Sequence, residues 1–147
     1  MAAKSTSWAN KLLKLVFNND DATGIGDAGG LLGSTVDGNL YVSLHTATPG
    51  AGGDQTTNEV TYGAYARVAV ARTTGGWTVT GATVVNAAAV IFPQATTGPQ
   101  TATHAAIGTA ASGAGVLLYF GAIPGDLIIA LSDIPTLSAG SVTGTES

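Results

Sequence analysis

The segment LYVSLHT, residues 40–46, decides the fold class. Apolar Leu40, Val42 and Leu44 alternate with more polar neighbours, and Pro49 and Gly50 follow the run. Alternation with a period of two, ended by turn-forming residues, is typical of a strand that buries one face. The segment therefore predicts a half-buried β-strand.

Further runs of this kind follow along the chain, and each is bounded by Gly, Pro or small polar residues. Short strands at regular spacing are typical of antiparallel sandwiches, and about eight of them suit a jelly roll. We therefore expect an all-β fold, a jelly-roll-like antiparallel β-sandwich of about eight strands. The predicted strands are residues 40–46, 65–73, 77–80, 83–92, 103–108, 116–123, 127–131 and 137–143.

The first 39 residues have a different pattern. Residues 5–17 predict a short amphipathic helix, because Trp8, Leu12, Leu15 and Val16 recur on one helical face. Residues 18–39 are rich in Gly and Asp and predict a long loop. We expect an N-terminal helical arm and loop over residues 1–39 and a β-sandwich domain over residues 40–147. The helix either packs on the chain's own core or docks on a neighbouring subunit.

The chain carries unusually little charge. It has 147 residues with five Lys or Arg, nine Asp or Glu and no Cys, and its formal net charge is -4. Soluble surfaces usually carry about a quarter to a third charged side chains. Either neutral polar residues cover the surface or neighbours in an assembly cover it, and we favour assembly because obligate interfaces are depleted in charge.

The same composition argues against several partner classes. No Lys/Arg cluster provides the positive patch that nucleic-acid binding needs, so no nucleic acid is expected. No apolar run approaches the length of a membrane span, and the start lacks a secretory signal pattern, so no membrane is expected. We expect synthesis in a cytoplasm.

Two motifs that can indicate cofactors or metals lack the necessary context. Residues 24–29 match G-x-G-x-x-G, but a dinucleotide site needs a strand before the motif and a helix after it. His45 and His104 are the only histidines, too few for a zinc site without added carboxylates, and the loop aspartates lack calcium-loop spacing. We expect no cofactor and no metal.

Catalysis has little support in the sequence. Ser43 lies two positions from His45, which we interpret as too far for hydroxyl activation. His45 is instead expected to bond to a backbone group or a subunit neighbour. We therefore expect no enzyme and no catalytic residues.

Two further groups of side chains have competing interpretations. Tyr62 and Trp77, with other aromatic residues, could form a sugar-stacking platform, but core packing is the better explanation. The arginines are expected to form ion pairs rather than one anion site. Arg67 and Arg72 would pair with Glu59, Asp54 or a neighbouring chain.

Six short blocks along the chain form a recognisable set: residues 8–13 (WANKLL), 40–47 (LYVSLHTA), 65–67 (YAR), 86–90 (NAAAV), 103–104 (TH) and 117–119 (LLY). With these blocks the chain resembles a family of small tailed-phage proteins commonly labelled tail-fibre proteins. The resemblance implies a non-enzymatic virion component with a β-sandwich body, made in the bacterial host cytoplasm. The Gly- and Asp-rich segment at residues 25–38, which precedes LYVSLHTA, is longer than we would expect in such a protein.

The resemblance leaves the place on the virion open. A host-binding fibre usually needs a repetitive shaft, and no repeat is visible here. Our first hypothesis is a capsid decoration (cement) protein, a homo-oligomer, taken as a trimer, that binds the major capsid protein or other virion subunits and stabilises the assembled head. The alternative is a tail fibre or tail-tip module that could bind a host glycan. The expected interface residues are Trp8, Leu12, Leu15, Ile25, Leu31 and Leu32.

Overall fold

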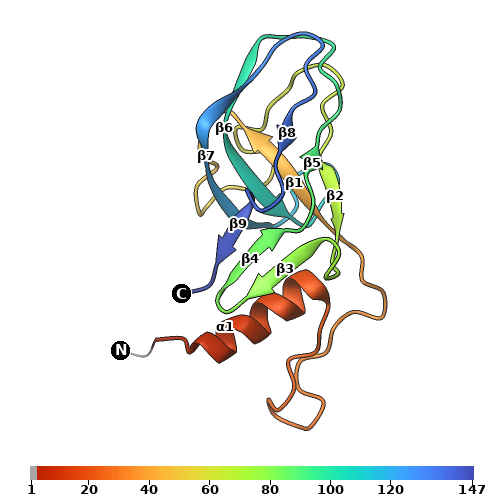
Figure 1. The fold of residues 1–147 in the computed structure, drawn as a ribbon, viewed down its shortest axis with the longest axis vertical. Helices are drawn as coiled ribbons and strands as arrows, with labels where there is room; N and C mark the ends of the chain where they lie inside the picture. The colour runs from red at the N-terminus through yellow and green to blue at the C-terminus, as the bar shows by residue number, and fades with distance from the viewer. Residues whose placement is uncertain (1–2) are drawn as a thin grey trace. The chain divides into compact units, whose positions relative to one another are not determined.

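The computed structural model describes residues 3–147, and these form antiparallel β-strands with one helical segment near the N-terminus (Figure 1). The all-β, antiparallel sandwich class predicted from the sequence is confirmed. The strands are β1 (Asn39–His45), β2 (Val68–Ala71), β3 (Trp77–Thr80), β4 (Thr83–Asn86), β5 (Val90–Ile91), β6 (Gln100–Gly108), β7 (Leu117–Ile129), β8 (Thr136–Leu137) and β9 (Thr143–Thr145).

The chain forms two compact units. Unit 1 contains the described residues up to 39 together with residues 70–89 and 138–147. Unit 2 contains residues 40–69 and 90–137. The N-terminal helix and loop therefore belong to the same unit as the three-stranded sheet β3-β4-β9.

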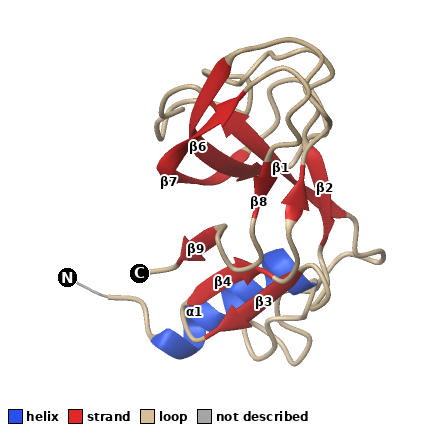
Figure 2. Cartoon of the chain, turned by 45° about the horizontal axis from the view of Figure 1, so that its top comes forward, coloured by secondary structure: helices blue, strands red, loops and turns tan. Residues whose placement is uncertain are grey.

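In unit 1, the helical segment packs on strands β3 and β4 (Figure 2). Helix α1 (Thr6–Leu13) continues as a π-helical turn, η1 (Lys14–Asn18). The Ser5 hydroxyl accepts a hydrogen bond from the Trp8 amide at 3.2 Å, which caps the first turn as expected for this residue type. Of the two interpretations of this helix, packing on its own chain is the one that the structure shows.

The buried face of the helix lies one position later than the sequence pattern indicates. Ala9, Leu13 and Phe17 are fully buried, whereas Trp8 and Leu12 are half-buried. The Phe17 ring meets the Trp77 ring edge-on, with centroids 5.0 Å apart. Ala9 is small, so the helix can approach the sheet closely at that point, and the larger side chains on either side lie along the border of the contact.

The loop that follows the helix is held by its own polar groups. Ala22 and Leu31 exchange backbone hydrogen bonds of 2.8 and 3.1 Å, which makes residues 22–31 a closed loop. The Asp21 carboxylate accepts from the Gly33 amide at 2.7 Å, and the Asp27 carboxylate accepts from the Gly30 amide at 2.9 Å. Asp21 and Asp27 therefore bind the loop backbone, as side chains of this type commonly do in turns.

The four-stranded sheet has the order β2-β1-β6-β7, and all of it except Asn39 and the last two residues of β2 belongs to unit 2, which also contains the two-stranded sheet β5-β8. Strand β1 pairs with β6 from Tyr41 opposite Gly108 to His45 opposite His104. The prediction that β1 is half-buried is wrong, because Ser43 and His45 are also fully buried. The connection after β1 covers this polar face, and the Val60 amide donates to the Leu44 carbonyl at 3.0 Å.

Three predicted segments are divided or joined differently in the structure, because tertiary pairing overrides local turn signals. The run at residues 83–92 divides into β4 and β5, and residues 116–131, predicted as two strands, form the single strand β7. The last predicted segment, residues 137–143, contains the end of β8 and the start of β9. Each difference depends on where a partner strand is available.

Candidate functional site

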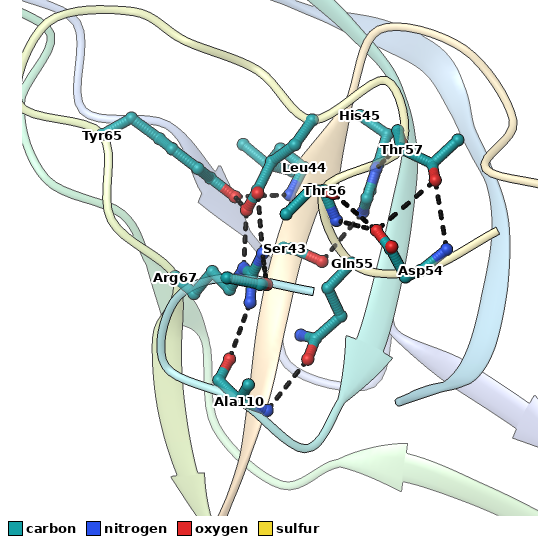
Figure 3. Close-up of polar contacts among 12 residues, drawn as sticks. Ser43, Leu44, His45, Asp54, Gln55, Thr56, Thr57, Tyr65, Arg67 and Ala110 are labelled. Atoms are coloured by element: carbon teal, nitrogen blue, oxygen red, sulfur yellow. Dashed lines mark hydrogen bonds and ion pairs between the residues drawn. The ribbon is translucent and has the colours of Figure 1, made fainter. Parts of the chain in front are cut away.

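A cluster of polar side chains lies inside unit 2 (Figure 3). Strand β1 supplies Ser43 and His45, which share one strand face because they are two residues apart. The connection between β1 and β2 supplies the remaining groups. These are Asp54, Gln55, Thr57, Glu59, Tyr65 and Arg67.

Ser43 and His45 form a direct hydrogen bond. Ser43 Oγ lies 2.9 Å from His45 Nε2, and His45 Nδ1 lies 2.8 Å from the Thr57 carbonyl oxygen. A carbonyl only accepts, so Nδ1 carries the proton and the Ser43 hydroxyl donates to Nε2. The expectation that these side chains are too far apart is wrong, because the imidazole extends from its Cβ and brings its outer nitrogen to the hydroxyl. The expected backbone bond of His45 is confirmed.

Burial lowers the pKa of His45, and nearby Arg67 and His104 lower it further, while the Thr57 carbonyl and Glu59 act in the opposite direction. The imidazole is therefore neutral at pH 7. Serine hydrolases also have a hydroxyl that is hydrogen-bonded to one nitrogen of an imidazole, with an acceptor bound to the other nitrogen. Here the Ser43 and His45 side chains are both 0% exposed, so a substrate cannot reach the hydroxyl in this structure. The arrangement satisfies polar atoms in a core.

Arg67 and Glu59 form a bidentate ion pair beside this hydrogen bond. Arg67 Nε donates to Glu59 Oε1 at 2.6 Å, and an Arg67 terminal nitrogen donates to Oε2 at 2.7 Å. The Tyr65 hydroxyl donates to Glu59 Oε1 at 2.9 Å. The hydrogen bonds to Glu59 raise the pKa of Arg67, and burial raises the pKa of Tyr65. The predicted pairing of Arg67 with Glu59 is confirmed.

The same cluster holds the turn between β6 and β7. Arg67 donates to the Ala110 carbonyl at 2.9 Å and to the Gly113 carbonyl at 2.8 Å. The buried Gln55 side chain accepts from the Ala110 amide at 2.9 Å. A Cβ at Gly108 would overlap the Gln55 side chain, so only glycine leaves room for it. The cluster therefore holds the turn that leads from β6 into β7 in one conformation.

Arg72, in unit 1, has a different role from the predicted ion pair. Its guanidinium donates to the carbonyls of Leu15 at 2.8 Å and Val16 at 2.7 Å. These carbonyls lie near the C-terminal end of the helical segment, where a cation is favourable because of the helix dipole. The sequence predicted a carboxylate partner for Arg72, but the acceptors are backbone carbonyls at this end of the helical segment.

The predicted interface residues divide into two groups. Trp8, Leu12 and Leu15 on the helical segment are half-buried within unit 1. The loop residues are exposed, and so is Val36, which was not among the predicted residues and, at 74%, is the most exposed large apolar side chain in residues 3–147. The exposed loop residues that were predicted are Ile25, Leu31 and Leu32.

Two of the aromatic residues considered for sugar stacking, Tyr62 and Trp77, are buried. Trp77 is in the core of unit 1, and Tyr62, in unit 2, donates its hydroxyl to the Pro93 carbonyl at 3.0 Å. Burial raises the pKa of Tyr62 to about 12. Both residues therefore have the core-packing role that the sequence favoured.

Residues 3–147 contain neither a candidate metal site nor a membrane-spanning helix. No group of three or more His, Cys, Asp or Glu side chains among them is placed to hold a metal ion. In the same part of the chain, no helix has the length and apolar character needed to cross a membrane.

Comparison with known proteins assigns the family. Residues 3–145 match the family model described as "Podophage GP4 fiber I protein gp80". No curated protein matches the chain. The family match extends over both units and includes the helix, the loop and the polar cluster. The chain therefore belongs to the Podophage GP4 fiber I protein gp80 family, a family of phage fibre-type structural virion proteins.

Proposed function

We propose that this chain is a fibre subunit of a phage virion and that the loop of residues 19–38 attaches it to another virion subunit. The observation that carries the proposal is the apolar exposure of this loop. Ile25, Leu31, Leu32 and Val36 all lie within it, and Leu32 is 68% exposed. We expect these side chains to form one apolar patch, and contiguous exposed apolar patches mark interaction sites.

The loop has the properties of a preformed contact surface. Besides the bonds described above, the Asn19 side chain donates to the Ser34 carbonyl at 2.8 Å and accepts from the Ser34 amide at 2.6 Å. Because these bonds already order the loop, its association with a partner loses less conformational entropy than that of a disordered segment. Its apolar residues can then contribute most of their burial free energy to binding.

The helix residues Trp8, Leu12 and Leu15 have a secondary part in this proposal. They are half-buried against their own unit, so only part of each side chain is available to a partner. Truncating them would change the stability of unit 1 as well as attachment. The exposed loop residues therefore provide the cleaner test.

A capsid decoration role is the second candidate, and the low charge of the chain favours it. Only 10% of the residues are charged, which suits a subunit covered on several sides by coat protein. In this role the major capsid protein would be the partner, and the chain would be present as an oligomer, proposed as a trimer. Copy number separates the two roles, because a head decoration protein is needed in hundreds of copies and a fibre subunit in far fewer.

The attachment test compares two variants of equal charge in the virion. Leu32→Asp with Val36→Asp places carboxylates in the apolar loop, whereas Thr74→Asp with Ala88→Asp places them at other exposed positions of unit 1. We expect the loop variant to be incorporated about tenfold less or lower, since about 1.4 kcal/mol of lost contact free energy has that effect. The control should be incorporated normally, and both should unfold at the wild-type denaturant concentration.

Particle imaging and quantitative mass spectrometry of the purified virion give the location and the copy number. Equal incorporation of the two variants would refute attachment through the loop. Hundreds of copies distributed over the head would refute the fibre role and favour decoration.

A further inference from the structure

The net charge of the chain is concentrated in the loop of residues 19–38. This loop contains four Asp and no Lys, Arg or His, so its formal charge is -4. The rest of the chain contains five Lys or Arg and five Asp or Glu, so its formal charge is zero. The loop therefore has the whole formal net charge of the chain, and it is also the segment that exposes Ile25, Leu31, Leu32 and Val36.

The four aspartates of the loop are exposed. They are Asp20, Asp21, Asp27 and Asp37. Asp21 and Asp27 accept from backbone amides, and Asp37 accepts from the Asn19 side chain at 3.1 Å, so all of these donors are uncharged. None of the four carboxylates forms an ion pair within residues 3–147. Their charge is therefore available to a partner.

A second copy of this chain is a poor partner for the loop. Four of the five basic side chains are engaged within the chain, two in ion pairs and two on backbone carbonyls. They are Lys4, Arg67, Lys11 and Arg72. Two loops placed face to face would bring a charge of -4 against another of -4. Juxtaposed like charges oppose association, so the loop fits a different protein better than it fits itself.

The loop combines two requirements that a partner has to meet. Burial of Leu32 and Val36, which are 68% and 74% exposed, needs an apolar counterpart. The carboxylates of the same loop need cations opposite them, because a charge that loses water without gaining a partner opposes binding. Nucleic acids and anionic lipid surfaces are negatively charged and would be repelled. The partner class that meets both requirements is a protein surface with an apolar centre and a border of Lys or Arg.

We propose that the loop of residues 19–38 binds a different virion protein through such a surface, and that the loop carboxylates select this partner. The proposal rests on the attachment role proposed above, which concerns the apolar side chains, and adds the chemistry of the partner. Opposite charges at the border of an apolar contact direct association and exclude wrong partners.

The test is a competition for places in the virion. Cells that express a variant of the full chain are infected with the wild-type phage, and mass spectrometry compares the ratio of variant to wild type in particles with the ratio in the lysate. Asp20→Asn with Asp37→Asn removes two charges from the loop, and Asp126→Asn with Asp133→Asn removes two exposed charges outside it. Asp37 and Asp133 each accept a hydrogen bond, and asparagine keeps an acceptor oxygen at both positions.

We expect the loop pair to be incorporated about threefold to tenfold less than wild type, because exposed ion pairs are individually weak. The control pair should be incorporated like wild type, and all variants should unfold at the wild-type denaturant concentration. Equal incorporation of the two pairs would overturn the proposal. Incorporation of the loop pair above the control would indicate an acidic partner and would overturn it too.

A neutral variant separates this inference from the attachment role. Leu32→Ser with Val36→Ser removes apolar surface without changing the charge of the loop. If this variant is excluded from particles while the loop Asn pair is incorporated like its control, attachment through the loop stands and the cationic partner is refuted. Normal incorporation of the Ser variant would refute both. A purified wild-type chain that dimerises, and loses the dimer in the Ser variant, would show that a second copy covers the loop and would overturn the choice of partner.

Discussion

Arg67 and His45 stabilise the polar interior of unit 2 in different ways. Arg67 keeps its charge inside the protein, with its side chain 3% exposed, because Glu59 and two backbone carbonyls accept its hydrogen bonds. His45 is buried as a neutral ring, because Ser43 and the Thr57 carbonyl use its two nitrogens. Removing a partner from either residue leaves an unsatisfied buried group, which has a greater free-energy cost than the net gain from one hydrogen bond.

We predict that Glu59→Gln destabilises the protein by on the order of 3 kcal/mol, because it removes the carboxylate from a buried guanidinium. Asp54→Asn is the control, since Asp54 lies in the same connection and accepts only from neighbouring threonine groups. Its effect should be much smaller. Urea unfolding measures both variants. Equal destabilisation would mean that the ion pair has no special role.

The lowered pKa of His45 predicts a pH-dependent stability. In the unfolded chain the imidazole binds a proton below about pH 6.5, whereas the folded protein holds it neutral to lower pH. The unfolded state therefore binds more protons in this pH range. The free energy of unfolding that the neutral His45 contributes is fully present above about pH 6.5, and it is lost as pH falls through the lowered pKa of His45.

Unfolding midpoints measured from about pH 8 to 5 should fall on the acidic side for the wild type. The slope should flatten in His45→Gln and persist in His104→Gln. An unchanged slope in His45→Gln would assign the pH dependence to another group.

Individual residues of the helical segment contribute differently to the stability of unit 1. Phe17 is fully buried against Trp77, whereas Trp8 lies on the border of the same contact. Truncating a fully buried aromatic side chain removes its transfer free energy and leaves a cavity, whereas a half-buried one loses only part of its contacts.

We therefore predict that Phe17→Ala costs about 3–5 kcal/mol of unfolding free energy. Trp8→Ala should cost clearly less, although tryptophan is the larger residue. Denaturant titration, followed by circular dichroism so that the loss of Trp8 does not affect the signal, compares the two. A larger effect at Trp8 would show that the face indicated by the sequence pattern, rather than the observed one, stabilises the helix.

Strand β7 shows how pairing competes with local sequence at the level of elements. Pro124 and Gly125 indicate a turn, and the chain does bulge there, but pairing with β6 resumes at Leu127. Residues 83–92 show the opposite outcome. The strand ends at Asn86, whose side chain donates to the carbonyls of Ala88 at 2.7 Å and Ser138 at 2.9 Å. Neither result follows from strand propensity, since both depend on a distant segment.

On the scale of the whole molecule, the two units are built from interleaved parts of the chain. Unit 1 gathers three separate segments, and the helical segment within it covers Trp77, which is fully buried. Residues 3–38 therefore supply part of the core of unit 1 and also carry the exposed loop. This dual role links folding to the proposed attachment surface.

We predict that deleting residues 1–38 disrupts unit 1 selectively. The amides of β3 and β4 should lose hydrogen-exchange protection, because the deletion removes the cover of their apolar side chains. The central strands β1 and β6 of unit 2 should retain theirs, and Trp77 fluorescence should shift to the red. Full protection of β3 and β4 in the shortened chain would show that the helix is dispensable for folding.

The all-β class, strands near β1, β3 and β6, the N-terminal helix and the polar loop can be predicted from sequence because alternation, helical period and turn residues are local properties of a chain. The pairing of Arg67 with Glu59 was also foreseeable, since buried or half-buried charges need partners. The burial of both faces of β1, the Ser43–His45 contact, the role of Arg72 and the border position of β7 were decided by tertiary structure. Each of these depends on which remote segment lies alongside, and short-range patterns do not contain that information.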